Sequence, residues 1–313
     1  MRRHVLALAV ALLPLPVLAQ EDDRSYLTAF LEDNLSGAGR QVTVTGFAGA
    51  LSSRATIQEL TIADDQGVWL TLRDVALDWN RAALFRGEIS VNELSAAEIE
   101  VARLPVSEDA APSPEAGSFS LPELPVSVTV SKLAAARIVL GAGVLGQPVE
   151  GQLEASAVLA GGEGDALLRL ERTDSGPDGS VALKASYSNF GRRLAIDLSA
   201  SEGQGGIAAT LLGLPGQPAA ALEIKGDGPF SKFAADVALS TDGVKRLAGQ
   251  ITLEEGAEAT GFAARLSGDL APLFLPDYAE FFGDAVALDL TGQRHADGRL
   301  DLSRLSVSAG HWR

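Results

Sequence analysis

Few residues of this chain have the types and the spacing that would support covalent chemistry. The closest match is a G-x-G-x-x-G pattern at Gly141, Gly143 and Gly146, which follows an apolar stretch. In a dinucleotide-binding fold the third glycine of this pattern opens a helix whose N-terminus receives the pyrophosphate. Here Pro148 and a further stretch of alternating apolar residues follow, which indicates a turn between two strands. We therefore expect no cofactor.

The histidines and the paired acids offer no catalytic arrangement either. His295 and His311 lie in polar stretches without a spaced carboxylate or a second histidine, so we expect solvated side chains and no metal site. Adjacent acids such as Asp64 and Asp65 point to opposite faces of a strand and cannot act as a pair. The chain has no G-x-S-x-G pattern, so an enzyme is not expected.

Composition narrows the class of protein further. The chain has 313 residues, a net charge of −16 and no cysteine, so it has no disulfide bonds or thiolate metal sites, and a nucleic-acid partner is not expected. Hydrophobic residues make up 46% of the chain and aromatic residues only 5%. An outer-membrane barrel needs aromatic girdles at both membrane interfaces, which this composition does not supply.

The first 19 residues have the order of an export signal. Two arginines precede an apolar run over residues 5–18, and small residues lead up to Ala19. This order predicts a signal peptide over residues 1–19. The alternative is an uncleaved inner-membrane anchor, but the run is short and is interrupted by Pro14 and Pro16. Either way we expect a periplasmic protein associated with the inner membrane.

The remaining chain divides by the period of its apolar residues. Residues 20–40 predict a short amphipathic helix, and residues 41–104 an N-terminal β region. A change of phase between Leu72 and Val75 suggests a β-bulge. Residues 105–124 form a proline-rich loop, and residues 125–313 continue the alternation until the chain stops within a strand pattern, as in a truncated protein.

The alternation predicts a mainly β fold, namely a long curled antiparallel sheet, or β-groove, with an apolar inner face and one short N-terminal helix. Such a trough would hold acyl chains, since small aliphatic side chains leave room for a guest and water contact costs a lipid tail about 0.8 kcal/mol per methylene. The residues expected to line the groove and contact lipid are Val42, Val44, Val68, Leu70, Leu72, Val75, Leu77, Val126, Val128, Val181, Leu183, Leu194, Ile196, Leu198, Leu222, Ile224, Val237, Leu239, Ile251, Leu253, Leu288 and Leu290.

Several stretches also carry a family resemblance, namely residues 48–64, 67–79, 83–94, 99–103, 121–128, 144–148 and 275–283. They resemble the N-terminal region of the TamB family, a subunit of the translocation and assembly module within the AsmA-like group, most specifically over residues 48–103. The resemblance implies a Gram-negative envelope protein that conducts phospholipid or other acyl-chain lipids between the inner and outer membranes, assists outer-membrane protein assembly, or does both. It also implies an outer-membrane barrel partner, whose docking region is missing from this chain.

A passive secreted β-solenoid, such as the passenger of an adhesin, is the alternative interpretation. Solenoids show a fixed repeat with stacked identical residues, and no such repeat is found in this sequence.

Overall fold

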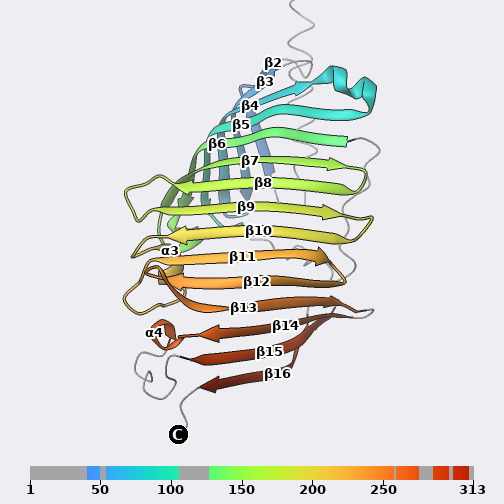
Figure 1. The fold of residues 1–313 in the computed structure, drawn as a ribbon. Helices are drawn as coiled ribbons and strands as arrows, with labels where there is room; N and C mark the ends of the chain where they lie inside the picture. The colour runs from blue at the N-terminus through green and yellow to red at the C-terminus, as the bar shows by residue number, and fades with distance from the viewer. Residues whose placement is uncertain are drawn as a thin grey trace, which may run out of the picture.

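The computed structural model describes residues 41–49, 54–105, 127–256, 259–274, 285–295 and 299–309. These residues form one large sheet with a few short helices (Figure 1). The predicted signal peptide, the helix over residues 20–40 and most of the proline-rich loop lie outside the described residues. The strands are β1 (Gln41–Thr45), β2 (Ala48–Gly49), β3 (Arg54–Asp64), β4 (Gly67–Asn80), β5 (Glu88–Arg103), β6 (Ser127–Gly141), β7 (Val149–Ala160), β8 (Glu163–Arg172), β9 (Gly179–Ser188), β10 (Arg193–Glu202), β11 (Ala220–Pro229), β12 (Lys232–Thr241), β13 (Val244–Glu255), β14 (Ala259–Gly268), β15 (Val286–His295) and β16 (Leu300–Ala309).

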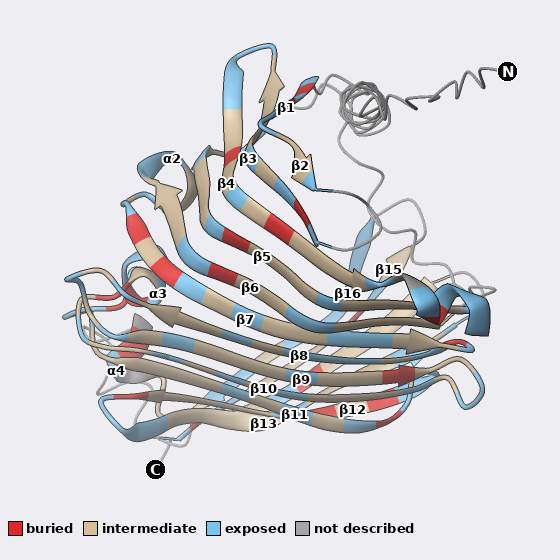
Figure 2. Cartoon of the chain, turned by 90° about the horizontal axis from the view of Figure 1, so that it is seen from above, coloured by how far each residue is buried: buried red, intermediate tan, exposed pale blue. Residues whose placement is uncertain are grey.

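The sheet has 16 strands, and each long strand pairs with the next one along the chain. The path starts at β1 and ends at β16, and these two strands do not pair within the described residues, so the sheet is open. Successive strands stack along the long direction of the molecule in Figure 1, and the strands bend along their length when seen from above in Figure 2.

One pair departs from the antiparallel pattern. β5 and β6 run parallel, with Ile99 opposite Ile138, so the expectation of a wholly antiparallel sheet is wrong at this point. The physical reason lies in the connection between them. Parallel neighbours need a crossover of a dozen or more residues, and the chain between Arg103 and Ser127 is long enough to supply it.

Turn residues account for the tight hairpins. Between β12 and β13 the chain turns on Asp242 and Gly243, whose φ angles are 49° and 74°. Two positive φ angles in succession are typical of the type I′ turn, which matches the twist of the strands that it joins.

The change of phase in β4 is shared by its neighbours. Apolar residues are three apart at Leu72 and Val75, and three apart again at Ile57 and Leu60 on β3, yet Leu60 pairs with Leu72 and Ile57 with Val75 without a shift. The predicted bulge is therefore not a one-sided insertion. Because adjacent strands have the same spacing, apolar residues stay opposite apolar residues.

Short helices lie at the ends of the strands. η1 (Arg81–Arg86) lies at one end, and α2 (Ala142–Leu145), α3 (Ile207–Leu211) and α4 (Ala271–Phe274) gather at the other (Figure 2). Ala209 in α3, Leu214 just after it and Leu273 in α4 form a small buried cluster against Leu239 of β12. No helix in the described part of the chain is long and apolar enough to span a membrane.

Candidate functional site: one apolar face of the sheet and its cavity

The strand register places apolar residues opposite apolar residues from one end of the sheet to the other. In the middle of the sheet Leu183 of β9 pairs with Leu198 of β10, and Leu198 pairs with Ile224 of β11. Residues paired directly in a sheet share a face. Apolar residues are paired with apolar residues on the other strands towards both edges of the sheet as well. Together these positions form one continuous surface, which we call the apolar face.

Most of the residues predicted to line a groove fall on the apolar face. On the N-terminal strands they pair with one another or with apolar partners on β3, β5, β6 and β7, and on the C-terminal strands they form unbroken rows. The structure brings together Val42, Val44, Leu70, Leu72, Val75, Leu77, Val128, Val181, Leu183, Leu194, Ile196, Leu198, Leu222, Ile224, Val237, Leu239, Ile251, Leu253, Leu288 and Leu290.

Two predicted positions are not placed on that face. Val126 lies outside the described residues. Val68 pairs with Ala63 beyond a register shift that leaves Trp69 as an extra residue in β4, and the Val68 residue is 48% exposed. An extra residue changes the phase of the alternation, so the period-two pattern could not be carried across it.

The apolar face reaches the free edge of the sheet. On β16, Leu305 pairs with Leu290, and Val307 pairs with Leu288. Leu305 and Val307 are 64% and 54% exposed, because no further described strand covers this edge. Exposed apolar side chains that are contiguous on a protein surface often mark an interaction site.

A cavity of about 390 Å³ lies where α3 approaches the apolar face. Its floor is formed by residues of that face, including Val181, Leu222 and Leu239, and α3 covers it with Ile207 and Leu211. Further apolar residues around it are Leu140, Leu145, Val149, Leu170, Ala200, Ala208, Leu212 and Leu214. The volume lies in the range of about 300–1,000 Å³ that small-molecule sites occupy.

Arg172 and Glu202 are the charged residues that line this cavity. Arg172 Nε donates to both carboxylate oxygens of Asp174, at 2.9 and 3.0 Å. Arg172 Nη1 lies 3.8 Å from Glu202 Oε1. The Arg172 side chain is only 9% exposed, and its Nη1 atom has no hydrogen-bond partner among the described residues.

The two acids of this cluster are held by backbone amides as well. Glu202 accepts hydrogen bonds from the N–H groups of Ile207 and Ala208 at the start of α3. A Cβ on Gly206 would come within 2.0 Å of Glu202 Cδ, so this approach requires glycine. Asp174 accepts from the N–H groups of Glu150 and Gly176, and Arg172 together with these amides holds the pKa of Asp174 below its usual value.

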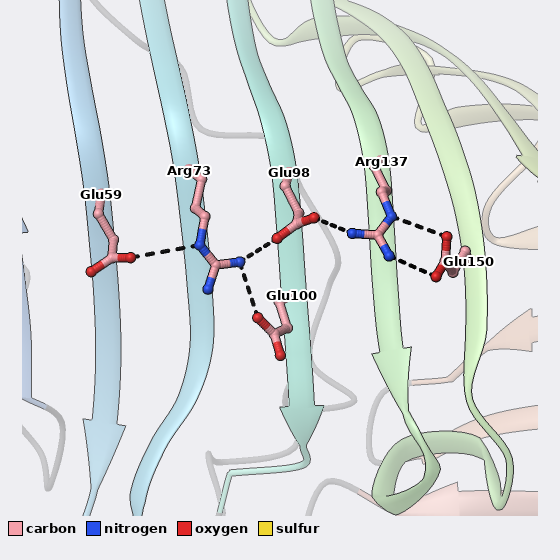
Figure 3. Close-up of polar contacts among 6 residues, drawn as sticks. All are labelled: Glu59, Arg73, Glu98, Glu100, Arg137 and Glu150. Atoms are coloured by element: carbon pink, nitrogen blue, oxygen red, sulfur yellow. Dashed lines mark hydrogen bonds and ion pairs between the residues drawn. The ribbon is translucent and has the colours of Figure 1, made fainter.

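The opposite face of the N-terminal strands carries a ladder of charges (Figure 3). Arg73 on β4 contacts Glu59 on β3 and Glu98 and Glu100 on β5, and Glu98 also contacts Arg137 on β6. The last rung joins two nitrogens of Arg137 to the Glu150 carboxylate on β7, at 2.6 and 3.0 Å. The charge ladder, as we call these six residues, therefore ties five adjacent strands together.

The ladder changes the ionisation of its members. The hydrogen bonds from Arg137 hold the pKa of the Glu150 carboxyl below its usual value. The hydrogen bonds that Arg137 donates to Glu150 and Glu98 in turn raise the pKa of Arg137. Nearby, Ser95 and Lys132 lower the pKa of Glu93 on β5. Each shift favours the charged form of the group, as a hydrogen-bonded ion pair does.

The residues that first suggested chemistry have structural roles. The glycines at 141–146 surround α2, a helix of four residues that leads into β7, so the long helix of a dinucleotide site is missing. Asp64, one of the adjacent acids, pairs with Arg103. Within the described residues no group of three or more possible metal ligands comes together.

The expectation for His295 was wrong. Its Nε2 lies 2.6 Å from Asp301 Oδ2 across the β15–β16 hairpin, so the ring has a carboxylate partner and is not simply solvated. The partner is six residues away in the sequence, and only antiparallel pairing brings the two together. His311 lies outside the described residues.

The sequence reasoning missed the cover of the cavity. Ile207 and Leu211 are four residues apart after two glycines, which is the spacing of one face of a helix, but the stretch is too short to be distinguished from a turn. Arg172 and Glu202 each end an alternating strand, and nothing in either strand alone indicates that the two side chains meet.

No protein-family model matches the chain, and no curated protein or solved structure matches it either.

Proposed function

We propose that the apolar face is the inner face of a β-groove that holds the acyl chains of lipids. The observation that carries the proposal is the continuity of that face. Apolar residues meet apolar residues across every strand pair of an open sheet, and among the described residues the face is covered only locally, by short helices. Each lipid methylene removed from water favours binding by about 0.8 kcal/mol, so an acyl chain that lies across several strands gains a large binding free energy.

The proposed place of this activity in the cell rests on the N-terminal residues and the family resemblance. The predicted export signal over residues 1–19 supports a location in the periplasm, next to the inner membrane. The likeness to the TamB family over residues 48–103 supports a role in outer-membrane biogenesis, with phospholipid or another acyl-chain lipid as cargo and an outer-membrane barrel as partner. We propose this chain as the part of such a conduit near the inner membrane.

The face opposite the apolar face is polar, which supports the proposal that lipid binds on the apolar face and that the opposite face contacts water. The charge ladder lies there, as do the ion pairs between Lys225 and Asp197 and between Arg193 and Asp227. Charged groups at these positions are solvated, whereas the same groups on the apolar face would have to be desolvated.

A passive solenoid fits the observations less well. A β-solenoid stacks its coils as parallel strands, whereas here neighbouring strands pair antiparallel except for β5 and β6. The described residues also leave the apolar face of the sheet largely uncovered, while a solenoid buries that face within its own coils.

A matched pair of substitutions on β10 tests the proposal. Leu198 and Ser199 are adjacent and point to opposite faces, so Leu198→Glu puts a charge on the apolar face and Ser199→Glu puts the same charge on the other. Lipids that co-purify with the chain from a bacterial envelope are measured by mass spectrometry. We expect phospholipid with the unsubstituted chain and with Ser199→Glu, and several-fold less with Leu198→Glu. Recovery of no lipid from any of the three would overturn the proposal.

A further inference from the structure

Two phenylalanine side chains project fully into water at one end of the sheet. Phe85 in η1 and Phe190 in the turn between β9 and β10 are 95% and 101% exposed, and no other large apolar residue in the described part of the chain exceeds 64%. In the turn between β11 and β12, by contrast, Phe230 packs edge-on against the buried Tyr187. Large apolar side chains held in water often mark an interaction site.

The strand register places both exposed rings at the same end of the strands, which we call the η1 end. Ser90, which follows η1 on β5, and Ser186, which precedes the turn at Phe190 on β9, belong to one row across the sheet. The β4–β5 and β9–β10 connections lie on the same side of the molecule in Figure 1. They are five strands apart, about 24 Å at about 4.8 Å per strand. The rings therefore form two separate projections and not one patch.

The turns at the two ends of the strands differ in charge. At the η1 end the described turns contain no acidic residue, and Arg86 and Arg192 lie next to the two phenylalanines in the sequence. At the opposite end the described turns contain neither lysine nor arginine, but they contain the acids Asp65, Asp174, Asp178, Asp242 and Asp269. An anionic surface repels carboxylates and attracts cations, so it would be approached by the η1 end.

The arginines near the rings keep hydrogen-bond donors for a further partner. Arg86 donates to Glu88 through Nε and Nη2, and Arg193 pairs with Asp227 through Nε. A guanidinium group has five N–H donors, so each of these pairs leaves several unused. Both arginine side chains are more than half exposed. Phosphate oxygens are acceptors that arginine binds well, which makes a phospholipid head group a suitable partner.

A bilayer fits this arrangement better than a protein partner does. Protein interfaces concentrate their binding energy in a few side chains that fill packed pockets near the centre of one contact area. Two isolated rings five strands apart would need two such pockets at a fixed spacing. A fluid lipid surface accepts apolar side chains at any spacing, and aromatic rings with neighbouring cations are enriched where lipid meets water.

We propose that the η1 end of the sheet docks on a bilayer that contains anionic phospholipid, with Phe85 and Phe190 inserted at the lipid–water interface. Docking in this way brings the ends of β4–β10 against the bilayer. The proposal goes beyond the proposed function, because the turns dock whether or not the apolar face holds lipid.

A fluorescent label at a single cysteine tests which end of the strands meets the bilayer. The chain has no cysteine, so Ala82→Cys in η1 and Gly191→Cys next to Phe190 each give one labelled position. A Cβ on Gly191 meets no atom closer than 3.8 Å, so the substitution is accommodated. Gln66→Cys, in the turn between β3 and β4, labels the opposite end as the matched control.

The full chain, labelled with nitrobenzoxadiazole, is reconstituted with vesicles of phosphatidylethanolamine and phosphatidylglycerol. The emission of this label moves to shorter wavelength when the label leaves water. We expect that shift at residues 82 and 191 and not at residue 66. Because the readout is local, it reports the docking end whatever residues 1–19 contribute to membrane association.

Substitution of each ring shows whether it holds the η1 end on the bilayer. Phe85→Ser in the chain labelled at residue 82, and Phe190→Ser in the chain labelled at residue 191, should each lower the ratio of inserted to free label about tenfold. Val244→Ser removes an exposed apolar side chain at the opposite end and should leave both ratios unchanged. All three side chains are exposed, so the variants should fold, and thermal unfolding checks this.

Two results would overturn the proposal. One is a response at residues 82 and 191 no larger than that at residue 66, which is the result expected if the rings bind a protein. The other is an unchanged ratio in the folded Phe85→Ser and Phe190→Ser variants. If either variant does not fold, the comparison of the three labelled positions decides. The lipid groove is tested separately by the lipid that co-purifies with the chain, so either proposal can fail alone.

Discussion

Strands β3–β7 and strands β8–β16 are parts of one sheet, yet they are supported on opposite faces. In the first region the charge ladder crosses five strands on the polar face, and the strands are 11 to 16 residues long. In the second region most strands have 10 residues, and α3 and α4 pack on the apolar face around Leu273. An open sheet whose described residues form no second layer can therefore be stabilised either by cross-strand ion pairs or by local apolar cover.

The difference predicts which parts of the apolar face stay open. Ion pairs on the polar face stabilise β3–β7 without occupying the apolar face. The helices of the second region do occupy it, and α3 encloses against the strands a cavity lined mainly by apolar side chains. Ion pairs on the polar face leave the apolar face of β3–β7 open, whereas the helices packed on the apolar face of β8–β16 enclose a pocket.

The largest expected effect comes from the apolar cover. Leu273→Ala removes a side chain that is 1% exposed and should lower the free energy of unfolding by about 2–5 kcal/mol. Leu302→Ala on β16 is the matched control, since Leu302 is 60% exposed and its truncation leaves no buried void. Denaturant unfolding measures both. Equal losses in the two variants would contradict the distinction between covered and uncovered parts of the sheet.

A smaller effect is expected from the centre of the charge ladder. Glu98 joins Arg73 to Arg137, so Glu98→Gln leaves two guanidinium groups with weaker partners. Amide hydrogen exchange should become several-fold faster in β4–β6 and stay unchanged in β8–β16. The control is Glu223→Gln, which changes an exposed glutamate on β11. If exchange in β4–β6 is unchanged, the ladder does not support those strands.

Acid should weaken the two regions unequally. The pKa values of Glu93, Glu150 and Asp174 are lowered in the folded chain, so these groups bind fewer protons folded than unfolded. The stability that they contribute is present above the ordinary carboxyl pKa of about 4 and is lost as the pH falls below it. Hydrogen exchange at pH 3, corrected for the intrinsic rate, should show β5–β7 losing protection before β11–β14. Simultaneous loss in both would count against this order.

The smallest effect is expected from the isolated ion pairs of the second region. Lys225→Met breaks the 2.8 Å pair with Asp197 on the polar face, where the Lys225 side chain is 75% exposed. Exposed pairs of this kind contribute little because water screens them. The melting temperature should therefore be unchanged within error. A clear decrease would show that β8–β16 also depends on charge pairing.

The alternation of apolar residues in the sequence predicted the face on which most side chains lie. The sequence did not predict features that depend on which strands pair and in which direction. The rows through Leu183, Leu198 and Ile224 could be predicted because each strand alternates for its full length. The parallel pair β5–β6 could not, since a long connection is compatible with either direction. Val68 was misplaced because one extra residue reverses the phase.

The polar part of the site was equally hidden in the sequence. Arg172 and Glu202 are 30 positions apart in the sequence (202 − 172). They come together because only one strand, β9, separates β8 from β10 in the sheet. Pairing of this kind depends on register, which a single sequence specifies through its apolar rows and not through its charges.

Among the described residues the sheet edges at β1 and β16 are unpaired, which determines how such a sheet can change in size. In a closed barrel, another strand widens the circumference and alters the interior. In an open path, another hairpin would lengthen the sheet by about 4.8 Å per strand and leave its profile across the strands unchanged. The length of the sheet and the shape of its cross-section are therefore independent in this architecture, so hairpins can be gained or lost to match a distance without changing the residues of the apolar face.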